Sequence, residues 1–196
     1  VLAIFLGLLL SNSNPATGPL EEVKGTVEAL RSIVNDPVLK GESRKKEKQG
    51  RIRALILERM DLAEMAKRSL GRHWRSISDQ ERAEYLDVFA KYIEIFYRER
   101  VFNSAEFIGM VEIKYLKETI DGAFAEVNTE VRAGGDKISV VYKLHLVNGH
   151  WKAYDIVIEN ISIVSNLRSQ FDRIIGQESF SELLKKLRGK IEALDK

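Results

Sequence analysis

The feature that most constrains the fold is residues 108–159, where three turn pairs containing glycine separate short alternating segments. The pairs are Asp121-Gly122, Gly134-Gly135 and Asn148-Gly149. Such pairs readily supply the positive φ angles that two-residue type I′ hairpin loops need. The segments between them alternate apolar and polar residues, as half-buried strands do. The sequence therefore predicts a four-stranded antiparallel meander over 108–159.

Two-residue loops also predict the strand register. They pair Val147 with His150, Ala133 with Asp136 and Ile120 with Ala123. One face of the sheet then collects apolar side chains from the second to fourth strands, among them Ala125, Val127, Val131, Ile138, Val140, Tyr142, Leu144, Trp151 and Ala153. The first strand is ambiguous, since Leu116 would join this face, whereas Val111, Ile113 and Tyr115 would join it only through a β-bulge.

Helices are predicted before and after the sheet along the chain, over residues 20–102 and 162–194. The 3.6-residue apolar period and the capping signals place them at 20–35, 41–57, 61–70, from 79 onward, 162–175 and from 180 onward. Ser78 and Glu81 form a capping box, Gly71 ends the third helix and Gly176 ends the fifth. The predicted fold class is α+β, with the sheet packed against a helical subdomain.

The helix that starts at Asp79 carries two apolar stripes instead of one. The first holds Leu86, Phe89, Ile93 and Phe96, and the second holds Tyr85, Val88, Tyr92 and Ile95. One stripe is enough for a surface helix. We therefore expect this helix to face the sheet and also a second apolar surface, which could be other helices or a bound ligand.

The inner face of the sheet includes three alanines, and the space above them must be filled. Helix side chains are one filler and a ligand is the other. A strand of about ten residues is roughly 33 Å long, whereas one bilayer leaflet contributes about 15 Å of hydrocarbon. An acyl chain would therefore fit lengthwise.

Composition excludes several classes. A chain of 196 residues fits one domain, and 31 basic against 29 acidic residues leave a net charge of +2, too little for a general polyanion binder. The basic segment 40–53 is interpreted as a solvated helix face, with a docking or lipid-headgroup surface as the alternative. The absence of cysteine excludes thiolate catalysis and disulfides.

The first eighteen residues differ from the rest. Val1–Leu10 is apolar and uncharged, and a segment rich in small and polar residues follows it up to Gly18. Ten residues are too few for a transmembrane helix but fit the hydrophobic region of a secretory signal. We interpret 1–18 as the remnant of a signal peptide and 19–196 as a single domain; the alternative is an apolar N-terminal helix or strand.

Catalytic signatures are weak. His73, His145 and His150 fall at a helix end, an outward strand position and a turn, and neither the G-x-S-x-G nor the H-E-x-x-H spacing occurs. An enzyme with a small substrate and a protein-binding adaptor with a filled core remain rival hypotheses. Asp155 is predicted on the inner face opposite Tyr142, where a carboxylate needs a partner. Arg168 is the candidate partner, or alternatively a ligand for a lipid phosphate.

Three spaced motifs carry a family resemblance. They are Met65-Ala66 with Leu70-Gly71 and Trp74, the segment 149–155, and Ser162, Asn166, Arg168, Gln170 and Phe171. In these residues the chain resembles the MlaC family of toluene-tolerance type, which are periplasmic phospholipid carriers. Two departures are Asn160, where the family usually has glycine, and Leu167, where an aromatic residue is common.

The resemblance implies an NTF2-like fold and an apolar pocket for acyl chains, with phospholipid as cargo and no catalytic group, metal or cofactor. It also implies two partners, an inner-membrane ABC transporter with an MCE-domain ring and an outer-membrane lipoprotein in complex with a porin. We expect a periplasmic monomer that supports outer-membrane lipid asymmetry and solvent tolerance and binds no nucleic acid. The predicted lipid-binding residues are Leu62, Met65, Leu70, Trp74, Phe89, Ile93, Phe96, Val127, Val140, Tyr142, Leu144, Trp151 and Arg168.

Overall fold

The fold is taken from a computed structural model that describes residues 17–194, apart from the side chains of residues 96–104 and 106. Nearly all of the predicted signal remnant, residues 1–18, lies outside the described residues. Among residues 17–194, no helix combines the length and the apolar character needed to cross a bilayer.

An antiparallel sheet and six α-helices make up the described chain, which confirms the α+β class. The helices are α1 (Pro19–Asn35), α2 (Lys45–Arg59), α3 (Leu62–Leu70), α4 (Asp79–Ile108), α5 (Ile163–Gln177) and α6 (Phe180–Leu194), with short 3₁₀ segments at Pro37–Leu39, Glu42–Arg44 and Gly71–Arg75. The strands are β1 (Glu112–Asp121), β2 (Phe124–Ala133), β3 (Asp136–Val147), β4 (His150–Ile158) and β5 (Ile161–Ser162).

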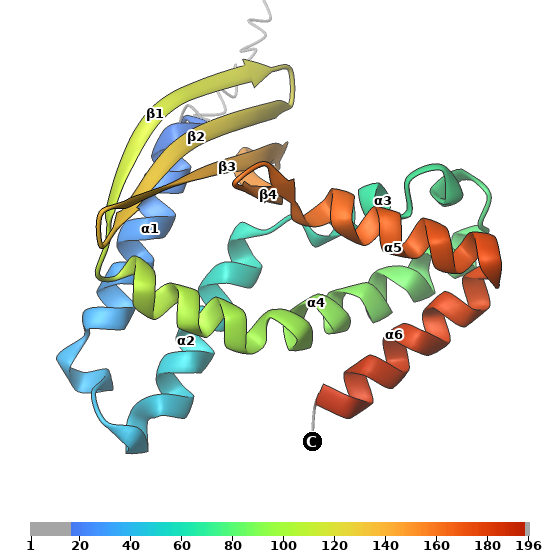
Figure 1. Ribbon diagram of the computed structural model, residues 1–196, viewed down its shortest axis with the longest axis horizontal. Coiled ribbons are helices and arrows are strands. Elements are labelled where there is room, and N and C mark those ends of the chain that lie inside the picture. The colour runs from blue at the N-terminus through green and yellow to red at the C-terminus, as the bar shows by residue number, and fades with distance from the viewer. Residues whose placement is uncertain (1–16, 195–196) are drawn as a thin grey trace, which may run out of the picture.

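The elements form two groups joined by the long helix α4. The sheet lies with α1 and α2 at one end of the molecule, and α3, α5 and α6 form a helical subdomain at the other (Figure 1). α4 runs through both groups (Figure 1). Its 30 residues span about 45 Å at 1.5 Å per residue, so one helix can take part in two separate cores.

Local capping explains where several helices begin and end. The Ser78 hydroxyl accepts from the Glu81 N–H, and the Glu81 carboxylate accepts from the Ser78 N–H, so the predicted capping box is present. Gly71 ends α3 with φ of 54°, and a Cβ there would lie 3.1 Å from Cδ of Arg168. The prediction that Gly176 ends the fifth helix is wrong, because α5 continues to Gln177. A helical glycine costs only about 1 kcal/mol.

The sheet has the strand order β1-β2-β3-β4-β5, one short strand more than predicted. Two of the three predicted turns have the predicted register, with Ala133 opposite Asp136 and Val147 opposite His150. The first turn differs, because Asp121 rather than Ile120 closes it, opposite Phe124. Gly122 and Ala123 therefore form this turn.

Two bulges change which side chains face inward. A bulge between Tyr115 and Lys117 leaves Leu116 62% exposed and places Ile113 and Tyr115 on the inner face. Of the two arrangements left open for the first strand, the structure therefore has the one with a bulge, and Leu116 does not join the inner face. A second irregularity beside Leu144 pairs Lys143 with Asp155 and Tyr142 with Ile156. Asp155 thus leaves the inner face, contrary to the prediction, and Ile156 takes its place.

The described residues of the two α4 stripes do not contact the sheet on one side of the helix and a second apolar surface on the other. Tyr85, Val88, Phe89, Tyr92 and Ile93 all belong to one core with α3, α5 and α6. Near the other end of α4, Ala105 packs with Leu30 and Val34 of α1 and Ile52 of α2. The expectation that this helix faces both the sheet and a second apolar surface is therefore not met by these five residues, because α3, α5 and α6 surround them.

Candidate functional site

The apolar inner face of the sheet has two parts that differ in what covers them. In the first, Val23 of α1 packs on Ala125, Val127, Leu144 and Trp151, and Leu20 joins them at the edge. We call this the covered part, since α1 fills the space above its small alanine side chains. Helix side chains, one of the two fillers considered, thus occupy this end of the face.

The remainder of the inner face is built by strand residues, and we call it the open part only because its described members include no helix side chain. Val111, Val131 and Val140 are its buried members, and its partly buried members are Ile113, Ala133, Ile138, Tyr142 and Ile156. Every described residue of this cluster lies in β1–β4 or directly before β1. No described helix side chain belongs to it, in contrast to the covered part.

Polar groups on this face are either paired or neutral. The Thr129 hydroxyl, 1% exposed, donates to the Val140 carbonyl oxygen at 3.0 Å. Burial raises the pKa of the Tyr142 phenol to about 12, so it stays uncharged at neutral pH. A surface of this kind can hold an apolar ligand by excluding water, and no described member of the open part is charged.

The structure divides the predicted lipid-binding residues between separate clusters. Met65, Leu70, Phe89 and Ile93 are buried in the helical core, with Leu62 and Trp74 packed against it. Val127, Leu144 and Trp151 lie in the covered part, Val140 lies in the open part, and Tyr142 borders both. The side chain of Phe96 lies outside the described ones. The helical and sheet members of the set are therefore not brought together.

Asp155 and Arg168 do not form the predicted pair. The Asp155 carboxylate accepts from the Ser162 hydroxyl at 2.6 Å and from the Val164 N–H at 3.0 Å, at the N-terminus of α5. Arg168 donates from Nε to the Arg68 carbonyl oxygen at 2.8 Å. Both residues hold α5 in place, Asp155 against β4 and Arg168 against α3.

The three histidines contact three different carboxylates. His73 lies 2.7 Å from Asp172, His145 lies 2.7 Å from Asp61, and His150 lies 3.3 Å from Glu22. The three histidines therefore do not meet at one site, which agrees with their separate positions in the predicted elements. Within the described residues, no group of three or more His, Cys, Asp or Glu is placed to hold a metal ion.

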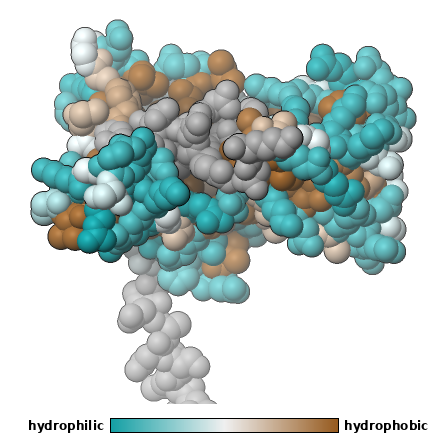
Figure 2. Space-filling view, turned by 90° about the horizontal axis from the view of Figure 1, so that it is seen from below, coloured by the Kyte–Doolittle hydropathy of each residue, from teal (hydrophilic) through white to brown (hydrophobic). Residues whose placement is uncertain are grey.

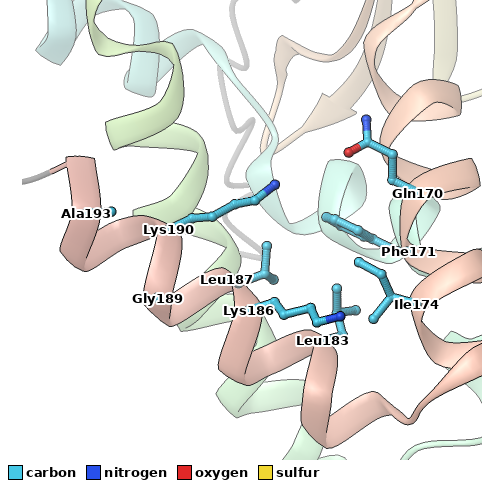
Figure 3. A pocket seen from close by; sticks show the side chains of 9 residues that line it. All are labelled: Gln170, Phe171, Ile174, Leu183, Lys186, Leu187, Gly189, Lys190 and Ala193. Carbon is cyan, nitrogen blue, oxygen red and sulfur yellow. The ribbon is translucent and has the colours of Figure 1, made fainter.

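Two cavities lie away from the open part. One, of about 310 Å³, lies between α5 and α6, where Phe171, Ile174, Leu183 and Leu187 point toward one another (Figure 3). The other, of about 140 Å³, includes Arg59, His150 and Trp151. Seen from below, apolar residues reach the surface in separate patches between hydrophilic ones (Figure 2).

Sequence reasoning missed two inward residues of β4, Ile156 and Ile158. Strict alternation continued from Trp151 and Ala153 leads to Asp155 instead. A signal was present, since Ile156 and Ile158 restart an apolar alternation in the opposite phase. Continued alternation would bury the carboxylate of Asp155, and this also indicates a bulge.

Comparison with known proteins gives two matches. The profile of a family described as "MlaC protein" matches residues 24–189. The fold is similar to the solved structure of a phospholipid-binding protein from Ralstonia solanacearum in complex with a phospholipid, with a TM-score of 0.72 and 20% identity. The match covers 92% of this chain and all of that one. None of the curated proteins matches this sequence.

Proposed function

The chain belongs to the MlaC family, and we propose that it binds phospholipid and carries it between membranes, with the acyl chains over the inner face of the sheet. The observation that carries the proposal is the open part, an apolar strand surface to which no described helix side chain belongs. The Ralstonia protein of similar fold, solved with a phospholipid, supports the same ligand class.

The thermodynamic requirement on such a carrier is strict. Each methylene kept out of water is worth about 0.8 kcal/mol, so leaving about ten of them wet would cost about 8 kcal/mol relative to the bilayer. An uncharged, water-excluding surface satisfies this requirement without any covalent step. The proposal therefore includes no catalytic residue, metal or cofactor.

The cellular role is part of the proposal. We place the mature protein in the periplasm as a monomer, after removal of the N-terminal segment 1–18 as a signal. Its partners would be an inner-membrane ABC transporter with an MCE-domain ring and an outer-membrane lipoprotein in complex with a porin. Shuttling between them would support outer-membrane lipid asymmetry.

The test is to purify the full chain, compare its mass under native and denaturing conditions, and extract it with organic solvent. We expect phospholipid in the extract and a mass difference that matches it. A protein that carries no lipid and takes none up from phosphatidylethanolamine and phosphatidylglycerol vesicles would contradict the proposal and favour an adaptor with a filled core.

A further inference from the structure

One row of directly paired residues crosses the whole sheet and changes from buried to exposed. Tyr115, Thr129, Val140, Ile158 and Ile161 are successive partners on β1 to β5. Directly paired residues on antiparallel strands share a face. Because Val140 belongs to the open part, Ile158 and Ile161 lie on the inner face as well.

From Thr129 to β5, exposure rises steeply along this row. Thr129 is 1% exposed and Val140 is 8% exposed, whereas Ile158 is 45% exposed and Ile161 is 65% exposed. The apolar surface of the open part thus continues without a break to the β5 edge of the sheet. There it ends in two isoleucines that face solvent, which we call the lip.

The backbone of the lip is held in an unusual conformation. Glu159 and Asn160 connect β4 to β5 with φ angles of 47° and 65°, both positive and neither at a glycine. Left-handed residues of this kind cost on the order of 1 kcal/mol each and persist where surrounding contacts hold them. Asparagine tolerates this region better than glutamate does.

Glu159 supplies those contacts. Its N–H donates to the Ser139 carbonyl oxygen at 3.0 Å, and its carboxylate accepts from the Ser139 N–H. The backbone and the side chain of Glu159 therefore both hold the turn against Ser139 of β3. The consequence is that Ile158 and Ile161 are presented as a fixed pair, although exposed isoleucine contributes little to stability there.

We infer that the lip is the place where a phospholipid acyl chain passes between the open part and the outside. This inference rests on the proposed function. An acyl chain that leaves the inner face must cross its edge, and every methylene that meets water there raises the barrier by up to about 0.8 kcal/mol. Two isoleucines continuous with the open part keep the chain in apolar contact during this step.

The test measures how fast lipid-free protein takes up a fluorescent phospholipid from phosphatidylethanolamine and phosphatidylglycerol vesicles. The lip variant is the double substitution Ile158→Ser with Ile161→Ser, and Ile161→Ser alone serves as a milder second variant. The matched control is Leu116→Ser, which removes a side chain of similar size that is 62% exposed at the β1 end of the sheet. Circular dichroism verifies that each variant is folded.

We expect the uptake rate of the double variant to fall about tenfold, which corresponds to losing roughly half of the apolar contact of two isoleucines at the barrier. The single variant should fall by an intermediate factor. Lipid content after prolonged incubation should stay within about twofold of the original, and the control should keep its rate.

Unchanged rates in both lip variants, or an equal loss in the Leu116 control, would overturn the inference. So would an equal fall of rate and final lipid content, because the isoleucines would then belong to the binding surface itself. Failure of the proposed function is distinct: in that case the original protein also takes up no phospholipid.

Discussion

The helical core and the open part of the sheet are both apolar, but their described side chains come from different kinds of element. In the helical core, Tyr85 and Phe89 are fully buried, and four helices contribute side chains around them. In the open part, the described members all come from one side, the sheet. Apolar composition therefore does not identify a ligand surface, because what matters is whether another element already fills it.

The largest effect is expected in the helical core. Phe89→Ala removes a ring that is fully buried and should lower the free energy of unfolding by about 3–5 kcal/mol. In a chain of this size that corresponds to a melting temperature roughly 10 °C lower. The lipid content of the molecules that stay folded should not change. If lipid is lost while stability is kept, Phe89 belongs to the ligand site and the comparison is wrong.

Asp155 tests the joint between the two regions. Asp155→Asn replaces one of two accepting oxygens by an amide that faces a donor, so the free energy of unfolding should fall by about 2 kcal/mol. Urea unfolding measures this loss. Arg168→Ala is the companion variant and should cost less than about 1 kcal/mol, since Arg168 makes one hydrogen bond from an exposed position. A fall in bound lipid in either variant would revive the phosphate role of Arg168.

Tyr142 gives the open part a signature in alkaline solution. Burial raises its pKa to about 12, above the value of about 10 for an unfolded chain. Below pH 10 both states are protonated and nothing changes. Between about pH 10 and 12 the unfolded state ionises first, so the folded protein loses stability as pH rises. Tyr142→Phe should reduce that loss, as measured by unfolding midpoints on either side of pH 10. If the unfolding midpoints of Tyr142→Phe fall with pH as much as those of the original protein, the Tyr142 phenol is exposed to water and the prediction is wrong.

The smallest effect on stability is expected from filling the open part. Val140→Trp should cost less than about 1 kcal/mol if the space above Val140 is available to a ligand, and about 1–3 kcal/mol if side chains already occupy it. Bound phospholipid should fall several-fold. Native mass spectrometry and thermal unfolding on one preparation measure both quantities. If the Val140→Trp variant is stable and binds as much phospholipid as the original protein, the acyl chains bind somewhere other than the open part.

Much of the secondary structure follows from local chemistry in the sequence. The Ser78 capping box, the Asp61 cap of α3 and the positive-φ glycine at position 71 act within a few residues, and so do the two-residue turns after Ala133 and Val147. Alternation then assigns Val127, Val140, Tyr142 and Leu144 to one face. The α+β class and the apolar character of the inner face were therefore predictable.

Tertiary structure decided what the apolar stripes face. The sequence shows two stripes on α4. Three neighbouring helices cover the members of both stripes from Tyr85 to Ile93, and no periodicity says which neighbours a stripe will meet. Bulges at Leu116 and before Asp155 change the phase of alternation. After the second bulge, the Asp155 carboxylate accepts hydrogen bonds from Ser162 and Val164 of the elements that follow β4. Local patterns determine which side chains avoid water, whereas contacts distant in sequence determine what replaces the water.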